Sequence, residues 1–353
     1  MNPRAAARAI DALHRGWPVT ISAGGKGYAL LAVESASDAA LAAFDPAGAA
    51  DLLIAAARAE TLKLTNQLAA AEPDHGVLVE RAPWMDLPLA MAVADPVQDL
   101  ASPMKGPFRA KPLTAPDAAA AALKLARLAG ILPAFFLLEG DIATEAAADA
   151  LDIESYDDAA RLAIATRARL PVAASETAEI IAFRSPEEPQ EHIALIIGKR
   201  DASVPVVRLH SECLTGDVLG SLKCDCGPQL HQALHQIADA KWGVLLYLRQ
   251  EGRGIGLVNK LRAYALQDQG FDTVDANIRL GFAIDARDFS VAARMLHLLN
   301  IDRVNLLTNN PKKVEGLEQA GVSVGKRLPL AIEANPHNAH YLTTKRDRTG
   351  HKL

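Results

Sequence analysis

The chain has 353 residues, of which 50% are hydrophobic and 22% are charged, a balance typical of a folded protein with more than one domain. The longest apolar run, Ile131 to Leu138, is far shorter than the roughly 18 residues that cross a bilayer, and the first fifteen residues lead us to expect no export signal. This composition excludes membrane-spanning and disordered proteins, so we expect a cytoplasmic protein with no membrane partner.

The net charge of −5 is unevenly distributed along the chain. Residues 201–353 contain 19 Lys plus Arg against 16 Asp plus Glu, whereas residues 1–200 contain 18 against 26. Positive potential concentrates anions, so we expect an anionic ligand to bind the C-terminal part. The positive excess is too small and too dispersed to indicate a partner nucleic acid.

The first 165 residues are rich in alanine and indicate alternating helices and strands. Helical periodicity predicts helices over 47–68 and 117–128, whereas short β-like runs predict strands over 18–21 and 76–79. Leu and Lys interrupt the alanine runs at helical spacing, which favours packed helices over low-complexity sequence.

The pattern changes near residue 168, where we place the boundary between domains 1–167 and 168–353. Two β-like runs, 179–183 and 193–198, flank a polar, proline-containing loop over 185–190 and predict a hairpin. Further strands are expected over 204–209, 244–248 and 304–307, alternating with helices over 227–238, 259–269 and 289–299. The predicted fold class is therefore α/β, with α+β mixed sheets in two domains.

All three cysteines, Cys213, Cys224 and Cys226, lie within fourteen residues. An odd, clustered set in a chain without an export signal favours a metal site over disulfides. Thiolates select zinc, and three protein ligands leave a fourth position for a reactive water. The alternative is a structural zinc site completed by His210 or His231. His210 also alternates with apolar residues on a predicted strand and could simply be packed.

Three further motifs are placed at loops that precede helices. They are Arg249-Gln-Glu-Gly-Arg253-Gly-Ile-Gly256, Asp285-Ala-Arg287-Asp288 and Thr308-Asn-Asn-Pro-Lys312-Lys313. Glycine-rich turns and basic side chains at the carboxyl ends of strands suit phosphate groups. Each motif alone could be a tight turn, a helix cap at Asp288 or a solvated charge at Lys312. Beside the cysteine cluster, they predict a zinc hydrolase that acts on a phosphorylated substrate.

From about residue 170 onward, the chain closely resembles GTP cyclohydrolase II, the first enzyme of riboflavin biosynthesis. The resemblance is carried by Arg208-Leu-His-Ser-Glu-Cys-Leu-Thr-Gly-Asp, Ser221-Leu-Lys-Cys-Asp-Cys-Gly, Arg249-Gln-Glu-Gly-Arg-Gly-Ile-Gly-Leu, Leu261-Arg-Ala-Tyr-Ala-Leu-Gln-Asp and Leu306-Leu-Thr-Asn-Asn-Pro-Lys-Lys. It implies zinc-dependent hydrolysis of GTP to 2,5-diamino-6-(5-phosphoribosylamino)pyrimidin-4(3H)-one, formate and pyrophosphate. Magnesium bound with the triphosphate and a homodimer are also implied.

The resemblance assigns roles to individual residues. Cys213, Cys224 and Cys226 would bind zinc, which activates water for attack at C8 of guanine. Arg287 matches the family's proposed nucleophile at the α-phosphorus, although an arginine is almost never neutral, so charge stabilisation is an alternative role. Asp285 would accept a proton. Tyr264 would lie near the reacting ring.

Contacts with GTP are implied for Arg208, Leu209, His210, Ser211, Glu212, Gln229, Glu251, Gly252, Arg253, Thr273, Thr308 and Lys313. Glu251 could accept from guanine N1 and N2, which would exclude adenine. Lys223 and Pro228 stand where arginine and an aromatic residue are more usual, so a related purine nucleotide stays an alternative substrate. Partial chemistry and a non-catalytic nucleotide-binding regulator are further alternatives, and the intact motifs argue against the regulator.

Residues 9–19 and 125–133 resemble a diverged 3,4-dihydroxy-2-butanone-4-phosphate synthase. The stretch Ser22 to Tyr28 holds no carboxylate where that family binds magnesium. Ala118 stands at the position of its catalytic histidine, whereas Glu139 is retained. We therefore expect a non-catalytic N-terminal domain with a scaffold or dimerisation role, or alternatively a regulatory site.

Overall fold

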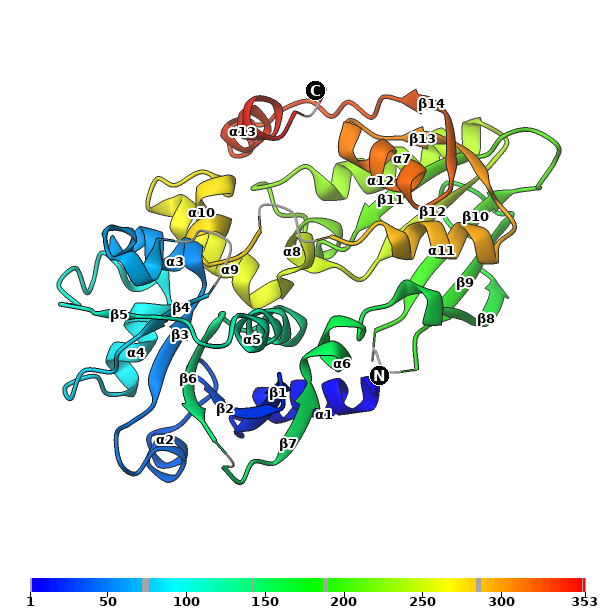
Figure 1. Cartoon of the computed structure of the whole chain (residues 1–353). Helices are drawn as coiled ribbons and strands as arrows, with labels where there is room; N and C mark the ends of the chain where they lie inside the picture. Colours follow the sequence, from blue (N-terminus) through cyan, green and yellow to red (C-terminus); the bar gives the residue numbers. More distant parts are fainter. Residues whose placement is uncertain are drawn as a thin grey trace. The chain divides into compact units, whose positions relative to one another are not determined.

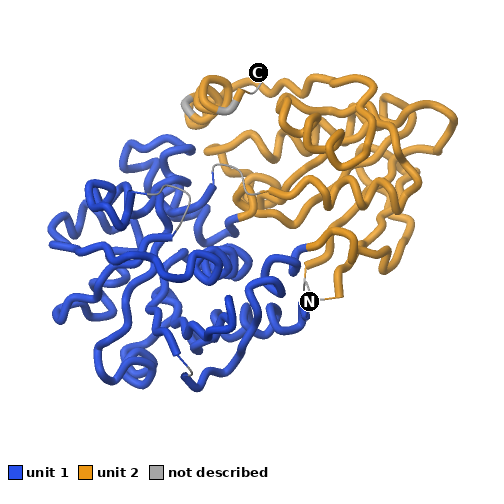
Figure 2. Tube along the Cα trace, in the orientation of Figure 1, with its two compact units in different colours: residues 1–157, 255–286 blue, residues 158–254, 287–353 orange. Residues whose placement is uncertain are grey.

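The computed structural model describes residues 2–71, 76–140, 142–186, 190–283, 287–350 and 352. The chain divides into two compact units (Figures 1 and 2): a first unit of residues 1–157 and 255–286, and a second unit of residues 158–254 and 287–353. Each unit contains a seven-stranded mixed sheet, which confirms the predicted class and the two-domain organisation. Within the described ranges, no helix is long and apolar enough to span a membrane.

The sheet of the first unit has the strand order β5-β4-β3-β6-β2-β1-β7, and only β1 and β7 run parallel. Its strands are β1 (Val19–Ala23), β2 (Lys26–Ala32), β3 (Asp51–Ile54), β4 (Val77–Val79), β5 (Ala110–Lys111), β6 (Ala134–Glu139) and β7 (Ala146–Asp149). Its helices are α1 (Pro3–His14), α2 (Asp38–Phe44), α3 (Ala56–Thr61), α4 (Leu87–Ala94), α5 (Pro116–Ala129), α6 (Ala150–Glu154), α9 (Gly256–Asp268) and α10 (Thr273–Arg279), with short 3-10 turns at Leu64–Asn66, Leu68–Ala70 and Pro96–Gln98.

Apolar side chains alternate between the two faces of this sheet. Leu53 and Phe135 pack on one face with α1 and α5, whereas Leu52 and Phe136 pack on the other. Helices α9 and α10 contribute to this second face, where they bury the apolar side chains Ile255, Leu266, Leu280 and Phe282. Residues 255–286 therefore belong to the core of the first unit, although they follow the second unit's central strands in sequence.

The division into units differs from the expected boundary. Residue 168 lies inside β8 (Ala163–Arg169), whereas the units change after Asp157. Nothing in the sequence marks residues 255–286 as part of the first unit, because an amphipathic helix has the same spacing of apolar residues whichever sheet it covers.

The predicted helix over 47–68 is wrong for Asp51–Ile54 and is confirmed at α3 (Ala56–Thr61), whereas helix 117–128 and strands 18–21 and 76–79 are confirmed. Residues Asp51–Ile54 form β3, which pairs with β4 and β6 in the middle of the sheet. Leu52, Leu53 and Ile54 are fully buried there. Burial on both faces favours a short continuous apolar run, which periodicity alone cannot distinguish from a helix.

The sheet of the second unit has the strand order β14-β13-β11-β12-β10-β9-β8. Its strands are β8, β9 (Ala178–Arg184), β10 (His192–Gly198), β11 (Val206–Ser211), β12 (Trp242–Leu248), β13 (Arg303–Leu307) and β14 (Ser323–Leu328). Its helices are α7 (Cys226–Asp239), α8 (Glu251–Gly254), α11 (Ser290–Leu298), α12 (Pro311–Gln319) and α13 (Ala339–Thr349), with a 3-10 turn at Ala159–Arg161 and a π-helical turn at Leu214–Val218. These bounds confirm the predicted strands and the helices over 227–238 and 289–299, and β9 and β10 form the expected antiparallel pair. The predicted helix over 259–269 is α9, which belongs to the first unit.

Two layers of helices cover the second sheet. Val207 and Leu209 of β11 pack with α11 and α12, whereas Val206 packs with α7 on the opposite face. Strand alternation therefore places Arg208 and His210 on the α7 side. Strands β11, β12, β13 and β14 run parallel, so their carboxyl ends meet at one edge of the sheet.

Candidate active site

The three cysteines gather at the carboxyl end of β11. Cys213 follows the strand, whereas Cys224 and Cys226 lie where α7 begins. Their sulfur atoms all lie within 4.8 Å of one another, and the Sγ atoms of Cys213 and Cys224 are 3.7 Å apart. Two thiolates bound tetrahedrally to zinc at about 2.3 Å lie about 3.8 Å apart. The three thiols thus match the donor set and spacing of a zinc site.

Histidine does not complete this cluster. Across the described ranges, no histidine or carboxylate atom joins the three sulfurs. Nε2 of His210 lies 3.0 Å from the Asp217 carboxylate, and His231 is exposed on α7. The structure therefore gives no support to a four-ligand structural site, and the fourth position suits a small ligand.

Gly216 leaves space for the cluster. A Cβ atom at this position would lie 2.8 Å from Sγ of Cys224 and 3.0 Å from Sγ of Cys213. Its amide N–H also donates to the Cys213 sulfur over 3.3 Å. A side chain here would fill the space around the thiols, so the π-helical turn requires glycine for a geometric reason.

Asp217 connects β11, β12 and the cysteine loop. Its carboxylate accepts hydrogen bonds from the Tyr247 hydroxyl over 2.9 Å and from the Cys213 amide over 3.0 Å, and it binds His210. The His210 and Tyr247 rings stack with centroids 5.6 Å apart. Burial lowers the pKa of His210, although Asp217 opposes this shift. A neutral His210 therefore helps to fix the loop that carries Cys213.

A second polar chain begins at Arg208. Its guanidinium donates to the Leu307 carbonyl over 3.1 Å and to Oε1 of Gln229 over 2.6 Å. Gln229 in turn donates to Asp225, which also accepts from Lys345 over 2.7 Å. Burial lowers the pKa of Arg208 to about 10, so this side chain is still a cation at neutral pH.

The glycine-rich segment after β12 forms α8 and a tight turn. Gly252 and Arg253 both have a φ of 63°, a left-handed conformation that arginine rarely adopts. The Glu251 carboxylate accepts from the amides of Leu214 over 2.7 Å and Gly252 over 3.0 Å. Glu251 thus ties this turn to the cysteine loop.

Two predicted residues follow β13. The side chain of Thr308 is 1% exposed, and its hydroxyl accepts a hydrogen bond from the Asn310 amide N–H. Asn310 in turn caps α12, because its side-chain oxygen accepts a hydrogen bond from the amide N–H of Lys312. Lys313 is 6% exposed and donates to the Leu209 carbonyl over 2.7 Å, whereas its neighbour Lys312 is exposed. The buried lysine therefore extends across the carboxyl end of β11.

The remaining predicted residues have different settings. Leu209 is buried in the core, so its side chain is unavailable to a ligand. Glu212 pairs with Arg249 over 2.8 Å. Arg287 lies over the Phe289 ring, and its charge lowers the pKa of Arg208. Tyr264 on α9 and Thr273 on α10 belong to the first unit, and Asp285 lies outside the described residues.

Unsatisfied polar atoms gather at this end of the sheet. Among the described residues, six buried side-chain polar atoms have no hydrogen-bond partner. Four of them are Arg208 Nε, His210 Nδ1, Ser211 Oγ and Gln250 Oε1, at β11 and directly after β12. Buried polar atoms are nearly always bonded to protein, water or a ligand, so this grouping indicates a binding site.

The sequence prediction missed several supporting residues. Asp217 and Asp225 lie within the cysteine motifs. Their carboxyl groups, close to the cysteines in sequence, were the signal from which these two residues could have been predicted. Tyr247 sits in an apolar strand and Lys345 on the polar helix α13, so neither position is marked by a motif. The structure places Lys345 against Asp225, 120 residues away in sequence.

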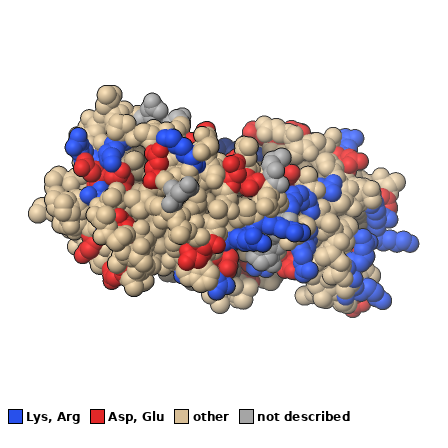
Figure 3. Space-filling model, turned by 60° about the horizontal axis from the view of Figure 1, so that its bottom comes forward, with Lys and Arg blue, Asp and Glu red and all other residues tan. Residues whose placement is uncertain are grey.

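Basic side chains extend beyond these loops. On the face drawn in Figure 3, Lys and Arg side chains predominate over the right-hand part. Arg167, Arg169, Lys199 and Arg200 of the second unit line a further open pocket of about 580 Å³. The second unit therefore carries exposed positive charge as well as the buried Arg208 and Lys313.

Comparisons with known proteins agree with this geometry. The family model for GTP cyclohydrolase II matches residues 163–329. GTP cyclohydrolase-2 of Azospirillum brasilense is 43% identical over 366 residues, which cover 99% of this chain and 94% of the relative. GTP cyclohydrolase-2 of Klebsiella pneumoniae is 57% identical over 175 residues, which cover 49% of this chain and 88% of the relative. A crystal structure of a two-domain 3,4-dihydroxy-2-butanone 4-phosphate synthase from A. baumannii matches 94% of this chain over 100% of its own length. Its sequence is 16% identical and the TM-score is 0.30, so this likeness is too weak to bear on function. The relative from A. brasilense matches nearly the whole chain, and we conclude that this chain belongs to the GTP cyclohydrolase II family of enzymes.

Proposed function

We propose that this chain catalyses zinc-dependent hydrolysis of GTP to 2,5-diamino-6-(5-phosphoribosylamino)pyrimidin-4(3H)-one, formate and pyrophosphate, the first step of riboflavin biosynthesis. The observation that carries the proposal is the cluster of Cys213, Cys224 and Cys226 beside four unsatisfied buried polar atoms. Family membership indicates GTP as the substrate. The site contributes three thiols that can bind a metal, next to buried polar atoms that have no hydrogen-bond partner.

The three thiols would hold zinc, with Gly216 leaving the space for it. Zinc bound by three protein ligands supplies Lewis acidity and lowers the pKa of a water molecule to about 7. Asp217, which accepts from the Cys213 amide and binds His210, holds the loop that carries the first thiol.

Basic residues of the second unit would bind the triphosphate. Arg208 and Lys313 are both nearly fully buried and are held by the backbone carbonyls of Leu307 and Leu209. Because these donors are held in place before the substrate arrives, little conformational entropy is lost when phosphate oxygens bind to them. Magnesium accompanies the triphosphate in this proposal, because its oxygens are hard ligands.

Glu251 would recognise guanine. Its carboxylate accepts hydrogen bonds from the amides of Leu214 and Gly252, which hold it beside the cysteine loop. By the family resemblance, a carboxylate at this position pairs with the N1 and N2 donors of guanine, which adenine lacks, so we expect strong discrimination between these bases. Gly252 and Arg253 shape the turn that presents this carboxylate.

We assign the remaining chemistry to residues matched by the family resemblance. Arg287 would stabilise negative charge on the departing pyrophosphate, since a guanidinium is protonated at neutral pH. Asp285 would accept a proton, and Tyr264 and Thr273 would contact the nucleotide. His210, Ser211, Glu212, Gln229 and Thr308 would complete the binding site.

Removal of zinc from the full-length protein tests this proposal. We expect the zinc-loaded protein to release formate and pyrophosphate from GTP in equal amounts, and a chelator to abolish both until zinc is restored. Cys224→Ser should lower formate release by at least about a thousandfold, whereas the neighbouring control Ser221→Ala should retain activity. Pyrophosphate without formate would indicate partial chemistry, and GTP binding without any product would indicate a regulator.

A further inference from the structure

A separate pocket of about 500 Å³ opens in the first unit. Its lining includes Lys63, Asp99, Ser102, Lys105 and Arg279. Arg279 is the last residue of α10, and the other four come from the loops after α3 and α4. All of these groups belong to the first unit, whereas the cysteine cluster belongs to the second.

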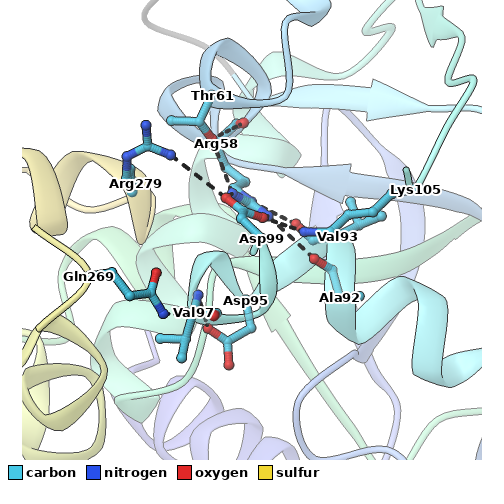
Figure 4. Close-up of polar contacts among 10 residues, drawn as sticks. All are labelled: Arg58, Thr61, Ala92, Val93, Asp95, Val97, Asp99, Lys105, Gln269 and Arg279. Carbon is cyan, nitrogen blue, oxygen red and sulfur yellow. Dashed lines mark hydrogen bonds and ion pairs between the residues drawn. The ribbon is translucent and has the colours of Figure 1, made fainter. Parts of the chain in front are cut away.

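Three cations surround the Asp99 carboxylate (Figure 4). Arg58 donates to both of its oxygens over 2.7 and 2.8 Å, Lys105 donates to one, and Arg279 lies 3.7 Å away. Only one negative charge therefore faces three positive charges. The next carboxylate, Asp95, opposes the lowered pKa of Lys105, but it lies outside the pocket lining, accepts from the Val97 amide and lies 3.5 Å from Arg262.

Arg58 is fully engaged in this network. Besides Asp99, its guanidinium donates to the carbonyls of Val93 over 2.6 Å and Ala92 over 3.3 Å, and to the Thr61 hydroxyl over 3.2 Å. It is 2% exposed and is not part of the pocket lining. Arg58 therefore fixes Asp99 in place and has little capacity for a ligand.

Lys105 and Arg279 do retain that capacity. The side chain of Lys105 is 5% exposed, and among the described residues its ammonium has Asp99 as its one acceptor, although it carries three donors. Arg279 stacks over the Phe271 ring at 3.9 Å and has no hydrogen-bond acceptor among the described residues. Burial lowers the pKa of Lys105 even though Asp99 opposes the shift. A buried cation with too little compensating charge is costly, so an anion in the pocket would stabilise this arrangement.

We propose that this pocket binds the phosphate group of a small phosphorylated metabolite, held by Lys105 and Arg279. A phosphate monoester carries nearly two negative charges, which suits a lining in which Lys63, Lys105 and Arg279 outnumber the single carboxylate, Asp99. The volume lies in the range of small-molecule sites and exceeds what a bare ion needs. Lys63, with a φ of 63° at the start of a 3-10 turn, lies at the lining and adds a third positive charge.

Binding here would fasten α10 to the loops of the N-terminal segment. Gln269, just before α10, donates to the Val97 carbonyl over 3.1 Å, and Arg279 ends the helix (Figure 4). A phosphate bridging Lys105 and Arg279 would add a second attachment at the other end of α10. The proposal depends on contacts of the first unit alone, so it stands or falls independently of the proposed GTP hydrolysis.

Calorimetric titration of the full-length protein with ribose 5-phosphate, inorganic phosphate and ribose tests the site. We expect saturable binding of ribose 5-phosphate, weakened at least about tenfold in both Lys105→Met and Arg279→Gln. The matched control is Lys111→Met, which removes another lysine of this unit that pairs with a single carboxylate, Asp51, outside the pocket lining. Equal affinity for inorganic phosphate would identify the phosphate group alone as the recognised element.

Equal affinities in the wild type and both pocket variants would overturn the proposal, because any binding would then occur at another site. Equal binding of ribose would overturn it too. Arg279 is 30% exposed, so its substitution should preserve the fold even if Lys105→Met does not. Crystals soaked in phosphate provide the second measurement, in which we expect density next to Lys105 Nζ and the Arg279 guanidinium.

Discussion

The two units have sheets of equal strand number but treat their buried polar groups differently. In the second unit, Arg208, His210 and Ser211 each leave one buried polar atom without a partner at the same strand end. In the described part of the first unit, Gln269 Oε1 is the single buried side-chain polar atom without a hydrogen-bond partner, and Asp45 pairs with Arg81 over 2.6 Å. Unsatisfied groups in one place favour ligand chemistry, whereas satisfied groups favour a scaffold.

Strand direction contributes to this difference. Parallel strands β11, β12 and β13 end together and bring three loops to one edge. In the first unit, the position where the synthase family has acidic residues is a tight hairpin between β1 and β2, with Gly24 and Gly25 at φ values of 58° and 78°. Glu139 is exposed and pairs with Lys26 over 2.5 Å. These features agree with our expectation that the N-terminal half performs no synthase chemistry.

The contrast between the two units is incomplete for residues 255–286, which belong to the first unit but follow strands of the second unit in sequence. This segment lies inside the region matched by the GTP cyclohydrolase II model, yet its helices bury Leu266, Ala276 and Leu280 in the core of the first unit. Tyr264 and Thr273, which we assign to the GTP site, lie on these helices. The N-terminal half therefore supports part of the enzyme's proposed machinery through packing.

The largest effect is expected from Gly216→Ala. The added methyl group would lie 2.8 Å from Sγ of Cys224, so we expect most of the zinc to be lost and GTP hydrolysis to fall at least about 1,000-fold. Zinc content by elemental analysis and formate release provide the readouts, with Ser221→Ala as the control. Full zinc content and normal turnover would show that the thiols tolerate a methyl group.

Lys313→Met should have the next largest effect. Loss of this buried ammonium removes a phosphate donor and leaves the Leu209 carbonyl without its partner, so we expect kcat/KM for GTP to fall about 100- to 1,000-fold. Steady-state kinetics compare it with Lys312→Met, which removes the exposed neighbouring charge and should change kcat/KM less than about threefold. Similar losses in both variants would contradict the assignment of Lys313.

His192 should make the second unit sensitive to acid. Burial lowers the pKa of His192 to about 4, and the Arg249 charge adds to this shift. Its Nδ1 accepts from the Arg249 amide over 3.1 Å, which requires the neutral ring. The contribution to stability is therefore fully present above about pH 6.5, the usual value, and about 3 kcal/mol is lost as the pH falls through 4.

Denaturant unfolding between pH 7 and pH 4 measures this contribution. His192→Gln should flatten the acid dependence, whereas His231→Gln, at an exposed position of α7, should reproduce the wild type. Parallel acid dependence in the wild type and His192→Gln would assign the effect to other groups.

The smallest effect is expected in the first unit. Lys26→Met breaks an exposed ion pair with Glu139, so the melting temperature should change by less than about 2 °C and GTP turnover should not change. Calorimetry and the formate assay measure these quantities. A melting temperature lowered by more than about 2 °C would show that this exposed ion pair does contribute to stability.

The sequence predicted most of the second unit because strands, cysteines and glycine-rich turns each have local signatures. Cys213, Cys224 and Cys226 were predicted as a set, and the structure brings their sulfurs together. Strand β3 was missed because Leu52 to Ile54 lies in an alanine-rich stretch whose pattern fits a helix equally well. Lys345 and the packing of α9 on the first unit depend on contacts between distant residues, which local periodicity does not record.

One assay tests the contrast between the two units most directly. The zinc-loaded, full-length protein is incubated with magnesium, GTP and ribulose 5-phosphate, and formate, pyrophosphate and 3,4-dihydroxy-2-butanone 4-phosphate are quantified together. We predict equal amounts of formate and pyrophosphate and no butanone phosphate. Butanone phosphate formation would contradict the assignment of the first unit as a scaffold, and absence of formate would contradict the assignment of the cysteine site.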